Sequence, residues 1–203
     1  MIVKASKDDL CKVCGEDLSL PKLVIGRGNP TSNLMIIGEA PGAKEEELGQ
    51  PFVGRSGKLL DKLLKSVGIE PEIDSYMCNV VKCRPPNNRR PTKNEILESL
   101  PWLKQQILLV NPLVIILVGS TAFEAVLSIK CKVSKIRGTW QNWEGRFVMP
   151  IFHPSYLLRN PSEGKGFPVN LTRLDLFKVK EKLQEFDLSC ELSSSGLPMG
   201  DSK

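Results

Sequence analysis

Four short apolar runs, each bounded by turn residues, constrain the fold of this 203-residue chain more than any other feature. They are rich in Val, Ile, Leu and Met and cover Leu34–Ile37, Tyr76–Val81, Val114–Val118 and Phe147–Phe152. Runs of this length and composition are typical of strands buried on both faces, as in a parallel sheet. Because parallel strands are joined by crossovers, we expect helices between them.

Stretches with a helical pattern fill these intervals and follow the last run. They cover Lys58–Val67, Lys93–Leu109, Thr121–Leu127 and Leu171–Phe186. Thr92 and Glu95 form a capping-box pattern at the start of the second stretch. The alternation predicts an α/β fold, a three-layer α/β/α arrangement with a central four-stranded parallel sheet. We predict one domain over residues 1–186 and a disordered tail over 187–203, which is rich in Ser and Gly and lacks periodicity.

Composition narrows the class of protein. Hydrophobic residues make up 41% and charged residues 25%, which is ordinary for a globular chain with a core. The net charge of +5 favours polyanionic partners only mildly. The six cysteines are accompanied by a single histidine, His153, which excludes catalysis by paired histidines within one chain.

The N-terminus has no apolar segment of the kind found in signal peptides, and the longest apolar run, Leu113–Val118, is about a third of a membrane span. We therefore expect a cytoplasmic monomer without membrane contact. Thiols stay reduced there, so the cysteines are expected to be ligands, buried apolar side chains or reactive thiols.

Chemically informative residues follow the predicted strands. The turn Gly38–Gly42 comes after the first strand and carries Glu39, Asn79 lies near the end of the second, and His153 follows the fourth. Phe52 lies in a Pro/Gly-bounded turn. Each has a structural explanation on its own, such as a tight turn, core packing or capping of a strand end. Because ligands bind beyond the carboxyl ends of parallel strands, their convergence on one edge predicts a site.

Basic residues are clustered. The segment Lys82–Lys93 holds five cations and no acid, a second acid-free run covers Lys130–Arg137, and Arg159 lies in the loop after His153. Such runs are usually solvated surface, but around a crevice they are also typical of binding to a phosphate backbone.

The spacing Cys11-x-x-Cys14 is a two-ligand pattern found in zinc sites, iron–sulfur sites and redox proteins. Cys83, on the basic loop, is the leading third ligand. Cys78 lies in a predicted strand and is expected in the core, whereas Cys131 and Cys190 have no assignment.

Six stretches together resemble the family-4 uracil-DNA glycosylases, the iron–sulfur branch of their superfamily, over about residues 11–186. In family order they are Cys11–Cys14, Gly26–Pro30, Gly38–Gly42, Pro51–Gly54, Asn79–Pro86 and His153–Pro161. The resemblance implies a four-stranded parallel sheet between helices. It also implies cleavage of the N-glycosidic bond of deoxyuridine in DNA, which leaves an abasic site.

The resemblance also implies roles for single residues. Phe52 would stack on a flipped-out uracil, Asn79 would hydrogen-bond its O4/N3 edge, and His153 would donate to O2, where negative charge develops. The remaining residues expected to bind substrate are Ala40, Pro41, Gly42 and Arg159.

Glu39 and Glu45 are the carboxylates that could orient water or stabilise the sugar cation. Ala40 stands where other branches carry an acid, so no single general base is assigned. We expect Asn79 and His153 to matter more than either glutamate.

The family pattern has four cysteine ligands for a [4Fe-4S] cluster, and this chain matches three of them, Cys11, Cys14 and Cys83. The fourth position is Ser99. Ser99 or water could complete the cluster, Cys131 could substitute, or the cluster could be labile or absent. In the last case Cys11 and Cys14 could bind zinc or be plain thiols.

Two other classes of function compete with the glycosylase. A catalytically inactive nucleic-acid-binding module on the same scaffold is the first alternative. An iron–sulfur electron carrier is the second, and the base-reading side chains and the incomplete ligand set disfavour it.

Overall fold

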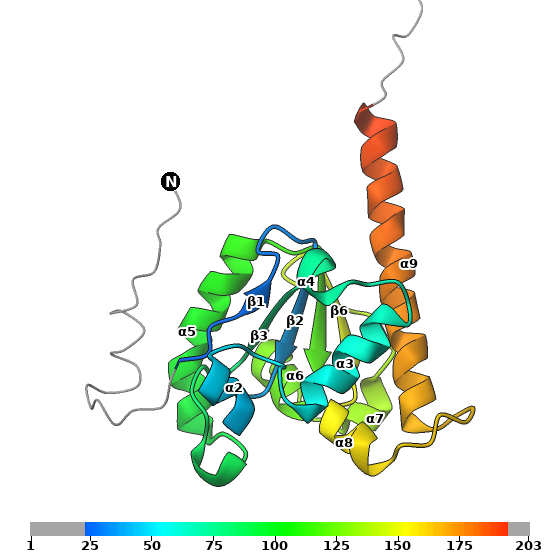
Figure 1. Ribbon diagram of the computed structural model, residues 1–203. Helices are drawn as coiled ribbons and strands as arrows, with labels where there is room; N and C mark the ends of the chain where they lie inside the picture. Colours follow the sequence, from blue (N-terminus) through cyan, green and yellow to red (C-terminus); the bar gives the residue numbers. More distant parts are fainter. Residues whose placement is uncertain (1–22, 195–203) are drawn as a thin grey trace, which may run out of the picture.

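The computed structural model describes residues 23–194, with side chains described for 23–186 and 188. Six strands form one mixed sheet in the order β1-β3-β2-β4-β6-β5 (Figure 1). Its four central strands are mutually parallel. They are β2 (Leu34–Gly38), β3 (Tyr76–Asn79), β4 (Val114–Val118) and β6 (Arg146–Ile151). The four predicted strands are therefore present, but the prediction did not include the two strands at the edges of the sheet.

One short antiparallel strand borders each side of the parallel centre. β1 (Arg27–Gly28) pairs with β3, and β5 (Gln141–Trp143) pairs with β6. Both were missed because strands this short and this polar leave no apolar run in the sequence. The turn between β5 and β6 has positive φ at Glu144 and Gly145, the geometry of a two-residue hairpin turn.

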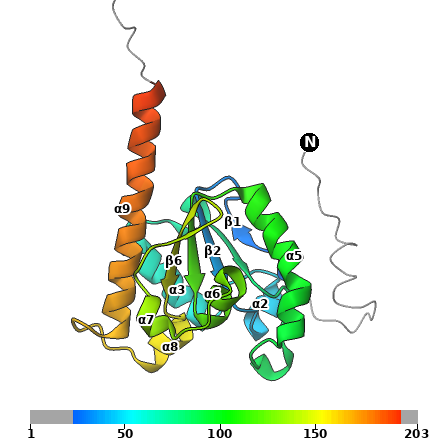
Figure 2. The ribbon, with the colours of Figure 1, turned by 180° about the vertical axis from the view of Figure 1, so that it is seen from behind.

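Helices cover both faces of the sheet (Figures 1 and 2). On one face lie α3 (Arg55–Lys65), α8 (Pro154–Arg159) and α9 (Pro168–Ser194). On the other lie α5 (Lys93–Val110) and α6 (Ser120–Leu127). The shorter helices are α2 (Ala43–Leu48), α4 (Pro71–Asp74), the 3₁₀ helix η1 (Pro86–Asn88) and α7 (Val133–Ile136).

The centre of the sheet is buried on both faces because the strands β2 and β4 carry no polar side chain. All residues of β2 and β4 are buried. Leu34 and Ile36 pack into the core beneath α3 and α9, whereas Met35 and Ile37 pack into the core beneath α5 and α6. This alternation follows from the two-residue period of a strand.

The predicted bounds of α5 and α6 are within one residue of the observed ones, and those of α3 within three. The capping box of α5 is confirmed, since Thr92 Oγ1 accepts a hydrogen bond from Glu95 N and the Glu95 carboxylate accepts one from Thr92 N, at 3.2 and 2.7 Å. Within the described residues no helix combines the length and the apolar character needed to cross a membrane.

The last helix is longer than its sequence pattern predicted. α9 continues to Ser194, into the segment predicted as a tail from residue 187, and its C-terminal part extends away from the sheet (Figure 1). Gly196 and Pro198 are the first helix-breaking residues after Pro168, and each further turn before them costs little once a helix has formed. Residues 195–203 lie outside the described part.

Candidate functional site

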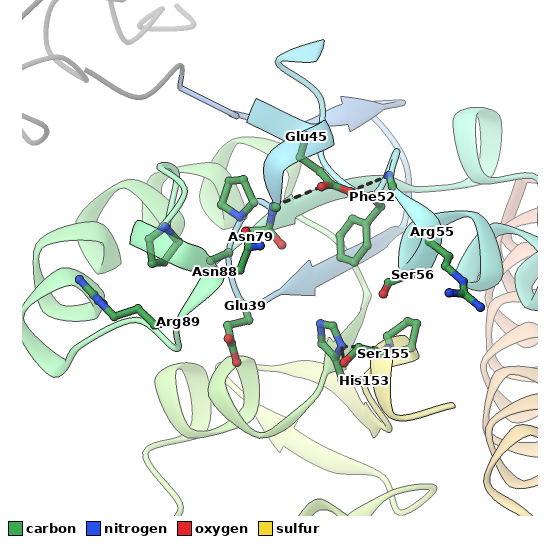
Figure 3. Close-up of a pocket in the computed structure, with 17 residues that line it drawn as sticks. Glu39, Glu45, Phe52, Arg55, Ser56, Asn79, Asn88, Arg89, His153 and Ser155 are labelled. Carbon is green, nitrogen blue, oxygen red and sulfur yellow. Dashed lines mark hydrogen bonds between the residues drawn. The ribbon is translucent and has the colours of Figure 1, made fainter. Parts of the chain in front are cut away.

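A cavity of 430 Å³ opens at the edge of the sheet where the parallel strands end (Figure 3). Eight residues predicted for the site line it: Glu39, Ala40, Pro41, Gly42, Glu45, Phe52, Asn79 and His153. They come from the end of β3 and from the segments that follow β2 and β6, with Glu45 on α2. Arg159 is exposed on α8 and does not line the cavity.

Gly38 makes room for the two side chains that form one wall of the cavity. A Cβ atom at this position would lie 2.4 Å from Asn79 Oδ1 and 2.6 Å from Phe52 Cζ. Figure 3 shows the ring of Phe52 and the carboxamide of Asn79 beside each other in the cavity. A residue without a side chain is therefore required at the end of β2.

The backbone around Phe52 is unusual. Phe52 has a φ of 57°, in the left-handed region that non-glycine residues rarely adopt. Gly57 on α3 packs against it so closely that a Cβ there would lie 1.9 Å from the Phe52 carbonyl oxygen. Because strained backbone persists only where its surroundings hold it, the start of α3 fixes the ring in place.

Asn79 is buried, and its backbone is held from several sides. Val80 N and Val81 N continue the pairing beyond β3 by donating to Gly38 O and Glu39 O, at 2.9 and 3.1 Å. The buried Lys82 Nζ donates to Asn79 O at 2.5 Å. Within the described residues the Asn79 carboxamide makes no hydrogen bond, so its donor and acceptor are both available to a ligand.

His153 is the N-cap of α8 and has a defined tautomer. Ser155 N donates to His153 Nδ1 at 3.2 Å, so Nδ1 is an acceptor and the neutral ring carries its proton on Nε2. Burial lowers the pKa of His153 below its usual 6.5. The nearby Glu39 opposes this shift, and Arg159 adds to it. The imidazole is therefore a neutral N–H donor at the cavity wall.

Glu45 uses both carboxylate oxygens on backbone amides. Its Oε2 accepts from Gly42 N at 3.2 Å and its Oε1 accepts from Gly54 N at 2.7 Å (Figure 3). The carboxylate thereby ties the turn after β2 to the loop that carries Phe52. It follows that the backbone amide of Gly42, one of the residues expected to bind substrate, already donates to Glu45.

Glu39 lies on the same side of the cavity as His153 but is held differently from Glu45. Thr121, buried in the first turn of α6, donates its hydroxyl proton to Glu39 Oε2. Arg90 Nε in turn donates to Thr121 Oγ1 at 3.0 Å. One carboxylate oxygen is thus fixed, and the other makes no hydrogen bond within the described residues.

The arginines of the predicted basic loop are each paired with an acid. Arg84 pairs with Glu46, Arg89 with Glu95 and Arg90 with Glu124, at 3.1, 2.7 and 2.9 Å. In the second basic run, Arg137 pairs with the buried Asp175. Most of these acidic partners lie far away in the sequence, so the sequence alone could not show that they neutralise the arginines.

The cysteines are only partly described. Cys78 is buried and free in the core, as predicted, and Cys131 is a free thiol packed against the core beneath α5 and α6. Cys83 is not a free thiol. Cys11, Cys14 and the Cys190 side chain lie outside the described residues.

Ser99 is buried on α5, and within residues 23–186 and 188 no group of three or more potential metal-ligating His, Cys, Asp or Glu side chains is found. A buried hydroxyl where the pattern needs a thiolate does not fit a cluster held by four cysteines.

The cavity also contains residues that the sequence did not single out. Asn88 and Arg89 reach it from the basic loop, and Ser155 and Ser56 line its lower and right sides in Figure 3. Ser155 could have been found, because a residue two positions after an N-cap often bonds to it. Thr121 could not, since its contact with Glu39 joins residues 82 positions apart.

Comparison with known proteins identifies related sequences. The model of the uracil DNA glycosylase superfamily matches residues 25–177. The chain is 46% identical to a type-4 uracil-DNA glycosylase of Thermotoga maritima over 75% of this chain and 80% of that protein. It is 35% identical to the type-4 enzyme of Archaeoglobus fulgidus over 87% of this chain and 92% of that protein.

Proposed function

The chain belongs to the uracil DNA glycosylase superfamily, and on that premise we propose that it hydrolyses the N-glycosidic bond of deoxyuridine in DNA. The reaction releases uracil and leaves an abasic site, the first step of base excision repair. One observation carries the proposal: a stacking ring, an unengaged carboxamide and a neutral imidazole donor line the same cavity at the strand ends.

The cavity would receive a uracil that has left the base stack. Flipping costs about a few kcal/mol, and stacking between apolar side chains offsets it. The ring of Phe52 provides one such face, and the turn Ala40–Gly42 forms the adjacent wall. The Asn79 carboxamide can pair with O4 and N3–H of uracil. Cytosine has the opposite donor and acceptor at these two positions, so the same carboxamide orientation rejects it.

Bond breaking places negative charge on uracil O2 and positive charge on the sugar. A donor that is already in position at O2 stabilises this charge without reorganisation. His153 fits this role because its Nε2–H is fixed by the bond from Ser155 N and because its neutral state needs no proton transfer before the reaction. We assign His153 as the donor to O2.

The two glutamates then have different roles. Glu39 keeps one oxygen available and is positioned by Thr121, so we assign it to orient the attacking water or to stabilise the sugar cation. Both oxygens of Glu45 already accept from backbone amides that hold the cavity loops together, so we assign it as a positioning residue.

A gel assay for alkali-labile breaks tests the proposed function. The substrates are single- and double-stranded oligonucleotides that contain one uracil, and the same sequences with thymine or cytosine are the controls. We expect breaks at uracil alone. DNA binding without breaks would instead support the alternative of a catalytically inactive binding module.

Replacing Glu45 by glutamine is expected to lower the single-turnover excision rate by about tenfold or more. The amide has only one acceptor oxygen, so it loses one of two hydrogen bonds to a charged group, each worth about 1.5–3 kcal/mol. The loops that carry Gly42 and Phe52 then separate. Glu46→Gln is the matched control on the same helix. Equal rates in the two variants would contradict the positioning role.

We propose further that uracil excision does not depend on a complete iron–sulfur cluster, because Ser99 replaces the fourth thiolate and no residue of the cavity would be a ligand. Anaerobically purified protein is expected to contain substoichiometric iron and sulfide, to retain excision, and to gain iron in the Ser99→Cys variant. Full iron occupancy in the parent protein, with activity lost on iron removal, would refute this.

Uracil-containing DNA is the proposed partner. Monomeric state and cytoplasmic location stay predictions from the sequence, which size-exclusion chromatography with light scattering and cell fractionation would test.

A further inference from the structure

A second hollow, of 600 Å³, adjoins the uracil cavity along the start of α3. We call it the α3 groove. Its lining includes four cations, Arg27, Lys44, Arg55 and Lys58, and one carboxylate, Asp61. Phe52, Gly54 and Arg55 line both the groove and the cavity, so the two hollows are continuous.

Two of the four cations are already neutralised. Arg27 pairs with Asp61 at 2.6 Å and with Glu72, and Lys44 pairs with Glu47 at 2.8 Å. Arg55 and Lys58 are exposed and form no ion pair within the described residues. Since they are three positions apart on α3, they project from the same side of the helix.

The opposite side of the cavity carries arginines that are paired. Figure 3 shows Arg55 and Arg89 on opposite sides of the cavity. Arg89 is held by both oxygens of Glu95, and its neighbours Arg84 and Arg90 also face carboxylates. The loop that looks basic in the sequence is therefore partly neutralised, whereas the α3 groove next to the cavity keeps two unpaired cations, Arg55 and Lys58.

We propose that the α3 groove binds the phosphate backbone of the DNA strand next to the flipped nucleotide, through Arg55 and Lys58. This inference rests on the proposed function for the identity of the ligand. A strand with one nucleotide in the cavity must continue past its mouth, and the groove shares Phe52, Gly54 and Arg55 with that mouth. Unpaired cations release counterions from the phosphates on binding, whereas paired cations must first give up their carboxylates.

Binding measured against salt concentration tests the proposal. The probes are fluorescent single- and double-stranded oligonucleotides with thymine in place of uracil, titrated by anisotropy between 50 and 200 mM salt. Each lost phosphate contact lowers the slope of log K against log salt by about 0.9 on duplex and about 0.7 on single strands. The double variant Arg55→Gln/Lys58→Gln is expected to lower the slope by the amount that corresponds to about two phosphate contacts. The single variant Lys58→Gln is expected to lower it by the amount for about one contact.

The control removes the same charge elsewhere. Lys104→Gln/Lys135→Gln changes two exposed lysines that line neither hollow, and its slope should match that of the parent protein. In excision assays, Lys58→Gln should raise KM and leave kcat unchanged, because it lines only the groove. Equal slopes in the groove and control variants, or an unchanged slope in Lys58→Gln, would overturn the proposal.

The outcomes separate this inference from the proposed function. A parent protein that binds DNA with the expected slopes but never releases uracil would refute the glycosylase activity and leave the groove assignment intact. If the protein releases uracil but the slope of log K against log salt is the same after Arg55 and Lys58 are replaced, only the groove assignment is refuted.

Discussion

His153→Ala is expected to slow single-turnover uracil excision by about 10²–10³-fold, the usual loss when one preorganised donor to a developing anion is removed. The fold should survive, because the side chain lies at a cavity wall and its local bonds are to Ser155 alone. Retention of the parent thermal midpoint and of DNA binding are the controls. Excision at the parent rate would show that His153 is not the donor to O2.

The same assignment predicts a pH dependence. Burial lowers the pKa of His153, and protonation of Nδ1 would break the bond from Ser155 N. The midpoint of the decline in excision at low pH should therefore lie below 6.5. Arg159→Gln removes a charge that lowers this pKa, so the pKa rises and the decline moves to higher pH. A decline that stays in place or moves to lower pH would contradict this reading.

Gly38→Ala is expected to reduce excision by about 100-fold or more, since displacing reacting groups by about 1 Å costs this much. The added Cβ would lie 2.4 Å from Asn79 Oδ1 and 2.6 Å from Phe52 Cζ, and both side chains would have to leave the positions that contact the base. Excision kinetics with increasing substrate would show a fall in kcat together with a rise in KM.

Gly164→Ala is the matched control. It lies in an exposed loop, its φ is not left-handed, and its nearest neighbour is the exposed side chain of Phe167 at 3.2 Å. We expect parent activity from it. Parent activity from Gly38→Ala as well would mean that Asn79 and Phe52 do not need their observed positions.

The centre of the sheet was predictable because burial on both faces requires uninterrupted apolar residues. Val114–Val118 is such a run, and its observed strand has the predicted ends. The edge strands β1 and β5 were not predictable, since two or three residues paired on one side need no apolar pattern. The end of α9 was predicted too early because the Ser and Gly content was averaged over the whole segment 187–203. A helix, once formed, continues until it meets a helix-breaking residue, and none occurs before Gly196.

Which residues form the candidate site was largely predictable from the sequence. Parallel strands end at one edge, so residues that follow strands in the sequence meet there. Asn79 and His153 lie at the cavity for this reason. Arg159 was predicted to contact substrate as well, but α8 carries it away from the lining, and its effect reaches the cavity through the pKa of His153.

The roles within the site depended on contacts that no short-range pattern contains. Glu39 and Glu45 are six residues apart and look alike in the sequence. One is held by Thr121 from α6, and the other is fully engaged by two backbone amides. The role of a carboxylate depends on which groups its oxygens already bind. Those groups come from residues that are close in space and need not be close in the sequence.

The sequence by itself determined the α/β class, the parallel core, the residues gathered at the strand ends and the missing fourth cysteine, because each of these is a local pattern or a residue identity. Only the tertiary structure decided the tautomer of His153, the division of work between the glutamates and the location of unpaired positive charge. The basic loop shows why. Its arginines are paired with Glu46, Glu95 and Glu124. A charge is neutralised by the opposite charges that lie close to it in space, whatever their positions along the chain.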